Sequence, residues 1–196
     1  MEETNLANTT KKRALLKLTF CFLDESGFSE KPPIRKTWGK KGKTPIIKST
    51  GSWKSITITG IIATKANRKK PRAFFTAKKG SVRSGDTVKT LKHLMRCVRG
   101  GIALFMDGLP AHRAKIVKEF LRENKDRFQM VERFPAYAPE LNPQEYIWSA
   151  SKGKDMANFC PSKDNDLQMQ TRKSLKRIQR TNSVIQGALK KSRLFD

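Results

Sequence analysis

Three carboxylates stand where the chain is expected to change direction. Asp24 follows the apolar run LLKLTFCFL, Asp107 follows IALFM, and Glu145 follows the proline-rich stretch FPAYAPELNPQ. Each has an ordinary structural explanation, because Asp begins turns and Glu145 stands three residues after Asn142, where a capping-box glutamate would be. The three prolines of the approach, however, restrict the backbone and so set the direction in which a first-turn glutamate points.

Three carboxylates brought together would suit a hard cation. Mg2+ binds through oxygen ligands and typically uses a few carboxylates, waters and substrate phosphates. Without a cation, clustered carboxylates repel one another and their pKa values rise. Two ions roughly 4 Å apart can activate the attacking oxygen and stabilise the leaving oxygen of an in-line phosphoryl displacement. We therefore expect Asp24, Asp107 and Glu145 to be metal ligands with phosphoryl-transfer chemistry.

Two further residues are expected beside this site without binding the metal. His112 comes five residues after Asp107 with a proline between them, which would place it on a first helical turn close to that carboxylate. A structural hydrogen-bond donor and a DNA contact are the other interpretations of His112. Asn142, followed by Pro143, is expected to cap the helix that carries Glu145 and to orient it.

The order of the elements predicts an α/β fold, with a mixed sheet flanked by helices. If the strands before Asp24 and Asp107 are parallel neighbours, both carboxylates emerge at one edge of that sheet. We expect Asp24 at the end of its strand, with ESG turning the chain. The expected strands are 15–23, 55–63, 72–77, 102–106 and 128–134, and helices are expected over 88–98, over 116–121 and from 142 onward.

The net charge points to a polyanionic partner. The 196 residues include 42 Lys and Arg against 17 Asp and Glu, a formal charge of +25 and a pI of about 10.4. Such an excess strains a compact fold unless a partner offsets it, and nucleic acid is the commonest one. No apolar run approaches the 18 residues that suggest a membrane span, and no long basic amphipathic helix suggests a membrane surface.

The basic stretch TWGKKGKT resembles a phosphate-binding loop, but Thr37 stands in place of its first glycine, so we reject nucleotide binding. Its lysines are interpreted equally well as DNA contacts and as a solvated loop. The expected DNA-binding side chains are Arg35, Lys36, Lys40, Lys41, Lys43 and Arg113.

We expect three segments along the chain. Residues 1–15 are a polar leader, 16–160 a catalytic domain, and 161–196 a basic, partly helical tail with nine Lys or Arg against three Asp. The three cysteines are odd in number and form no zinc-binding or CxxC spacing, so we expect reduced thiols.

The chain resembles a known family over roughly residues 18–161. The motifs that carry the resemblance are DESGF (24–28), PPxRKTWxxKGxTP (32–45), GS (80–81), DGLPAHR (107–113) and YAPELNPQEYIWS (137–149). Together and in this order they resemble the DDE transposases of bacterial insertion sequences in the mariner superfamily.

This resemblance implies a ribonuclease-H-like fold and DNA strand cleavage and joining that depends on Mg2+ or Mn2+, with two ions. It implies Asp24, Asp107 and Glu145 as the catalytic residues, with Asp24 bridging both ions and each of the others holding one. The freed 3′-hydroxyl would then attack target DNA.

The implied partners are double-stranded DNA, at the element ends and at the target, and a second copy of the chain in a homodimer. Relatives carry N-terminal helix-turn-helix modules, whereas only about fifteen residues precede the first strand here. A separate helix-turn-helix polypeptide is therefore a further expected partner, and the expected location is the nucleoid in a bacterial cytoplasm. Two alternatives stay open: a decayed DNA-binding remnant without catalysis, and a related nuclease that acts on RNA or branched DNA.

Overall fold

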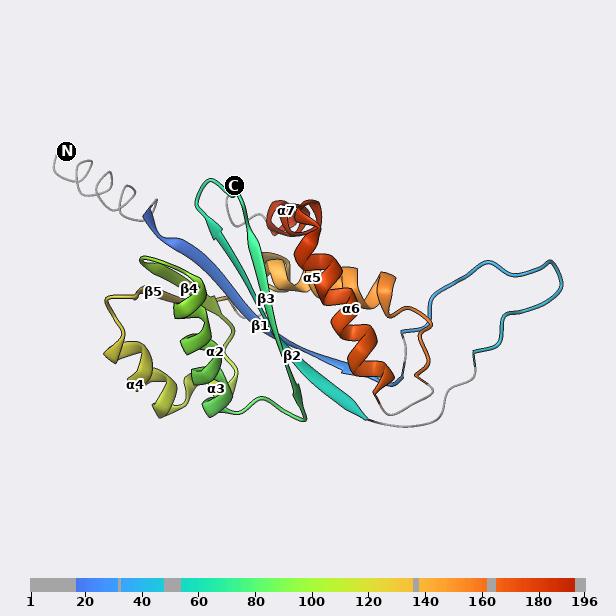
Figure 1. Ribbon diagram of the computed structural model, residues 1–196, viewed down its shortest axis with the longest axis horizontal. Helices are drawn as coiled ribbons and strands as arrows, with labels where there is room; N and C mark the ends of the chain where they lie inside the picture. Colours follow the sequence, from blue (N-terminus) through green and yellow to red (C-terminus); the bar gives the residue numbers. More distant parts are fainter. Residues whose placement is uncertain (1–16, 32, 48–53, 136–137, 162–164, 193–196) are drawn as a thin grey trace.

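The computed structural model places five strands in one mixed sheet with helices on both faces (Figure 1). It describes residues 17–31, 33–47, 54–135, 138–161 and 165–192. The strand order is β3-β2-β1-β4-β5, in which β1, β2 and β3 pair antiparallel and β1, β4 and β5 pair parallel. The strands are β1 (Thr19–Ser29), β2 (Ser55–Lys65), β3 (Arg72–Lys79), β4 (Ile102–Met106) and β5 (Phe128–Arg133).

Strand β1 corrects one expectation. We expected the strand to end at Asp24 and ESG to turn, but β1 continues to Ser29, paired with β2 as far as Ser55. The physical reason lies in β2, whose β-branched sequence SITITGIIATK offers a full antiparallel ladder that overrides the turn propensity of Ser and Gly. What ends before Asp24 is the parallel pairing with β4, whose last pair is Leu23 with Met106.

The parallel pair explains why two of the carboxylates meet. Asp24 directly follows Leu23 and Asp107 directly follows Met106, so both come one residue after the last parallel pair. They therefore lie at the same edge of the β1–β4 ladder, as expected. Successive side chains of a strand point to opposite faces, so Asp24 and the next residue, Glu25, face opposite sides of the sheet.

Each face of the sheet has its own helical layer and core (Figure 1). One face is covered by α2 (Ser84–Cys97), α3 (Pro110–Arg113) and α4 (Lys115–Glu123). The other face is covered by α5 (Pro143–Ala150), the π-helical turn η2 (Ser151–Asp155), α6 (Asp166–Arg180) and α7 (Asn182–Lys191). The short helix η1 (Pro139–Leu141) precedes α5.

Helices α6 and α7 fall within the segment expected to be a basic, partly helical tail. Their apolar side chains are buried in the same core as residues of β1 and α5, with the members Phe22, Trp148, Leu167, Leu175, Ile178, Ile185 and Leu189. The division of the chain into leader, catalytic domain and tail stays a prediction, and residues 1–15 lie outside the described residues.

Two further observations concern the described part of the chain. Cys21, Cys97 and Cys160 are free thiols. None of the described helices is long and apolar enough to cross a membrane.

Candidate active site

Asp24 is a buried carboxylate that is surrounded by other acids. Only 6% of the residue is exposed, and Trp148 Nε1 donates a hydrogen bond of 2.8 Å to Asp24 Oδ2. Burial raises the pKa of Asp24 to about 7, against the lowering effect of the Trp148 bond, and the nearby charges of Glu145, Glu25 and Asp107 raise it further. The other two predicted site carboxylates, Asp107 and Glu145, therefore lie within electrostatic reach of Asp24.

The Trp148 indole packs so closely against Gly60 that only glycine fits at this position. Gly60 of β2 pairs with Asp24, and a Cβ atom at Gly60 would lie 2.6 Å from Cη2 of Trp148. Contacts below 3.0 Å force a displacement, so the missing side chain lets the indole lie against β2. The rings of Phe28 and Phe75, with centroids 6.2 and 5.9 Å from that of Trp148, hold it from two other directions.

Glu145 is not engaged in capping its own helix. Asn142 is the N-cap of α5, as expected, because its Oδ1 accepts a hydrogen bond of 3.0 Å from the Gln144 N–H. The Asn142 N–H donates to the Pro139 carbonyl instead of to a Glu145 carboxylate, so no capping box forms. Glu145 is exposed, and its carboxylate makes no hydrogen bond or ion pair with any residue that the structure describes.

Asp107 is held through one of its two oxygens. Its Oδ1 accepts a hydrogen bond of 3.0 Å from the Leu109 N–H and lies 2.7 Å from Nδ1 of His112. Pro110 begins α3, which brings His112 back towards Asp107. Burial alone would raise the pKa of Asp107, but the interactions with His112 and the Leu109 N–H hold that pKa below its ordinary value.

His112 bridges Asp107 to Glu25, a residue that reaches it from the opposite face of β1 to Asp24. His112 is 2% exposed, and its Nε2 lies 3.2 Å from Glu25 Oε2. Burial would lower the pKa of His112, but the two carboxylates raise it to about 10. Ligand atoms of these three residues lie within 4.8 Å of one another. Both ring nitrogens of His112 face a carboxylate, so we assign the bridge to positioning Asp107.

Lys152 is a cation set among the acids. Its Nζ donates a hydrogen bond of 2.7 Å to Ser26 Oγ and lies 5.2 Å from the ring centroid of Phe28. Burial lowers its pKa, and the charges of Glu145 and Asp24 oppose that shift, so the ammonium lies within their electrostatic reach.

The turn that carries Lys152 is irregular. In η2 the Met156 N–H donates to the Ser151 carbonyl five residues earlier, which is the pattern of a π-helix. Such turns frequently occur at functional sites.

The side chains predicted to contact DNA are all exposed. Five of them, Arg35, Lys36, Lys40, Lys41 and Lys43, lie on the segment 33–47, which projects from the sheet (Figure 1), and Arg113 ends α3. The base of this segment is fixed by Asn158, whose Oδ1 accepts from the Arg35 N–H at 2.8 Å and whose Nδ2 donates to the Arg35 carbonyl at 2.9 Å. Their contact with DNA stays a prediction.

A comparison with protein families shows to which family this chain belongs. The model of the DDE superfamily endonucleases matches residues 19–166, a range that contains Asp24, Asp107 and Glu145. The chain is a member of the DDE endonuclease superfamily. A search among curated proteins gave no match.

Several structures of the Mos1 mariner transposase are among the solved structures similar to this DDE endonuclease. The Mos1 paired-end complex with the left transposon end has a TM-score of 0.64 and 18% identity, over 97% of this chain and 56% of that chain. The Mos1 catalytic domain has a TM-score of 0.57 and 16% identity, over 97% of this chain and 83% of that chain. The chain thus spans 56% of the length of the longer relative, and the likeness confirms the ribonuclease-H-like fold.

Four residues of this site were not predicted from the sequence: Gly60, Glu25, Trp148 and Lys152. A glycine within a β-branched strand is a recognised sign of close approach by another group, so Gly60 offered a signal. Trp148 follows Glu145 by three residues and lies on a neighbouring part of the helix surface. Nothing in the sequence alone indicated that Glu25, on the face of β1 away from Asp24, would reach His112.

Proposed function

We propose that this chain is the catalytic domain of a transposase, which cuts and joins DNA strands by metal-dependent phosphoryl transfer. The observation that carries the proposal is Asp24, a buried carboxylate whose pKa is raised by burial and by three neighbouring acids. The membership of the chain in the DDE endonuclease superfamily supports the same chemistry. A cluster of acids in a chain of charge +25 is costly without a cation to neutralise it.

The donor set fits magnesium or manganese. Asp24, Asp107 and Glu145 provide carboxylate oxygens, the ligands that these hard cations prefer. Glu145 has no partner among the described residues and Asp107 uses one oxygen for its local contacts, so both retain oxygen atoms for a cation. When bound, two ions would activate the attacking oxygen and stabilise the leaving oxygen of the displacement. Related Mos1 complexes were solved with Mn and with Mg.

The remaining side chains hold the ligands and the substrate. Trp148 fixes the orientation of Asp24 and favours its charged form through the hydrogen bond to Oδ2. His112 fixes Asp107 and keeps it ionised. Lys152 is placed to bind a phosphate of the DNA beside the carboxylates, because its ammonium is held near Asp24 and Glu145.

The proposed substrate is double-stranded DNA, at the ends of a mobile element and at its target. Mos1 was solved in a paired-end complex with a transposon end and in a strand transfer complex. We further propose that the chain acts at the nucleoid in a bacterial cytoplasm. Assembly as a homodimer and cooperation with a helix-turn-helix polypeptide stay predictions.

The proposal is tested by nicking of supercoiled plasmid in Mg2+, Mn2+ or EDTA, with Asp107→Asn as the inactive variant. Asp126→Asn is the matched control, because Asp126 is an exposed aspartate just before β5. We expect metal-dependent nicking by the wild type and by the control, and none by Asp107→Asn. DNA binding without nicking would favour the remnant, and nicking that survives in Asp107→Asn would contradict the proposed site.

A further inference from the structure

Helix α6 has one apolar face and one strongly basic face. Its apolar residues Leu167, Leu175 and Ile178 are buried against the sheet, which fixes the rotation of the helix about its axis. The opposite face exposes four cations. We call these the α6 basic face: Arg172, Lys173, Lys176 and Arg180.

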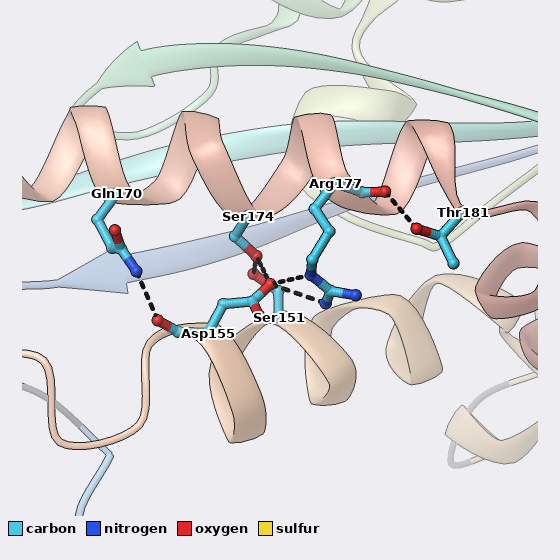
Figure 2. Close-up of polar contacts among 6 residues, drawn as sticks. All are labelled: Ser151, Asp155, Gln170, Ser174, Arg177 and Thr181. Atoms are coloured by element: carbon cyan, nitrogen blue, oxygen red, sulfur yellow. Dashed lines mark hydrogen bonds and ion pairs between the residues drawn. The ribbon is translucent and has the colours of Figure 1, made fainter.

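The acid that lies beside α6 does not neutralise this face. Asp155 Oδ2 accepts hydrogen bonds from Nε and Nη2 of Arg177 at 2.9 and 2.8 Å and from the Ser174 hydroxyl at 2.5 Å (Figure 2). Asp155 is thereby occupied by Arg177, a more inward residue of the helix. Within the described ranges, no carboxylate pairs with a member of the α6 basic face.

The spacing of the cations is unfavourable for an isolated helix. Arg172 and Lys176 are four residues apart, as are Lys176 and Arg180, and like charges at this spacing destabilise a helix. A polyanion along the helix would relieve this repulsion.

The geometry of the face suits a duplex backbone. From Arg172 to Arg180 the helix rises about 12 Å at 1.5 Å per residue, and duplex DNA carries one charge for about every 1.7 Å of its axis. An open hollow of ≈ 360 Å³ lies between α6 and β3 on one side, and one of ≈ 630 Å³ lies along the basic face itself. A membrane surface fits less well, because the large apolar side chains of α6 face the core, apart from Met169, which is 62% exposed.

We propose that the α6 basic face binds the phosphate backbone of duplex DNA beside the segment that is cut. This inference rests on the proposed function, because it sets the DNA beside the proposed carboxylates. Helix α6 lies on the same side of the sheet as α5 (Figure 1), and its apolar residues share a core with Trp148. The π-helical turn that carries Lys152 also carries Asp155, so the Asp155–Arg177 contact joins α6 to the turn beside the carboxylates. Contacts of Lys and Arg with phosphate position DNA without reading its sequence.

The test compares two triple variants that remove the same charge from opposite faces of the sheet. Arg172→Gln/Lys173→Gln/Lys176→Gln changes the α6 basic face. Lys89→Gln/Lys92→Gln/Arg96→Gln changes the exposed surface of α2 and is the control. The affinity for a short fluorescein-labelled duplex is measured in EDTA over a series of KCl concentrations, with thermal unfolding as a check on folding.

Each lost phosphate contact reduces the slope of log affinity against log salt by about 0.9, so the α6 variant is expected to lose about 2.7 from that slope. The control is expected to keep most of the wild-type slope. An unchanged slope in the α6 variant, or an equal loss in both variants, overturns the proposal. So does loss of binding to phosphatidylserine vesicles with the DNA slope intact, which would assign the face to a membrane. The binding measurement involves no cleavage, so its result can be interpreted even if the nicking assay fails.

Discussion

Replacing Trp148 by Phe tests how Asp24 is prepared for a cation. The substitution removes the hydrogen bond of 2.8 Å to Asp24 Oδ2 and keeps an aromatic ring packed against Gly60. Hydrogen bonds to charged groups contribute about 1.5–3 kcal/mol. Because this bond favours the ionised form, its loss raises the pKa of Asp24 further and makes a cation compete with a proton.

The same energy sets the expected effect on metal affinity. About 1.5–3 kcal/mol corresponds to a loss of roughly 10- to 150-fold in affinity, in line with the roughly 10- to 100-fold losses found when a group that supports a metal ligand is removed. Metal binding to the folded state raises its stability by an amount that depends on concentration and affinity. The rise of the unfolding temperature in a Mn2+ titration at neutral pH therefore measures the affinity.

Phe75→Leu is the matched control, because the Phe75 ring packs against the same indole and has no group that could hydrogen-bond to Asp24. The account predicts weakened Mn2+ binding in Trp148→Phe and near wild-type binding in Phe75→Leu. Equal Mn2+ affinities in the two variants would show that the hydrogen bond contributes nothing beyond packing around the indole, and would contradict the role given to Trp148.

Three further predictions concern stability. Gly60→Ala should cost about 1–3 kcal/mol by overpacking against Trp148, whereas Gly27→Ala, which meets nothing within 4 Å, should not; equal unfolding temperatures would contradict the close approach. The metal-free protein should lose stability as pH rises from about 4 to 7, because burial raises the folded pKa of Asp24 from 3.8 to about 7. The contribution of Asp24 is therefore complete below 3.8 and lost above 7. The loss is at most about 4 kcal/mol, and Mg2+ should reverse it; a flat or rising profile in EDTA argues against the buried carboxylate. His112→Gln should cost about 3–5 kcal/mol, because it leaves Glu25 without its buried partner, and urea unfolding that matches the wild type would exclude the bridge.

The sequence was most informative where a local pattern is repeated in the tertiary structure. The apolar runs before Asp24 and Asp107 became neighbouring parallel strands, since buried strands of this kind pair at the centre of an α/β sheet. Asn142 capped its helix as expected, because that contact lies within three residues. The end of β1 was misjudged, because it depends on pairing with β2, about thirty residues away along the chain.

The contacts that were missed join elements far apart in sequence. Trp148 reaches Asp24 across 124 positions, and Arg177 reaches Asp155 across 22, in a part of the chain that sequence patterns described only as basic and partly helical. A single sequence contains no record of such pairings. Gly60 was the exception, because a glycine inside a β-branched strand is a local mark of a distant contact.

We propose that Asp24, Asp107 and Glu145 act as one catalytic unit. The most direct test measures the rate of Mn2+-dependent plasmid nicking for Asp24→Asn, Asp107→Asn, Glu145→Gln and the triple variant. Glu140→Gln is the control, an exposed glutamate five residues before Glu145. When residues act as a unit, the effects of their substitutions on the rate are strongly non-additive. We therefore expect each single variant to lose nearly as much activity as the triple variant, while the control stays active. A Glu145→Gln variant that nicks as fast as Glu140→Gln would contradict it.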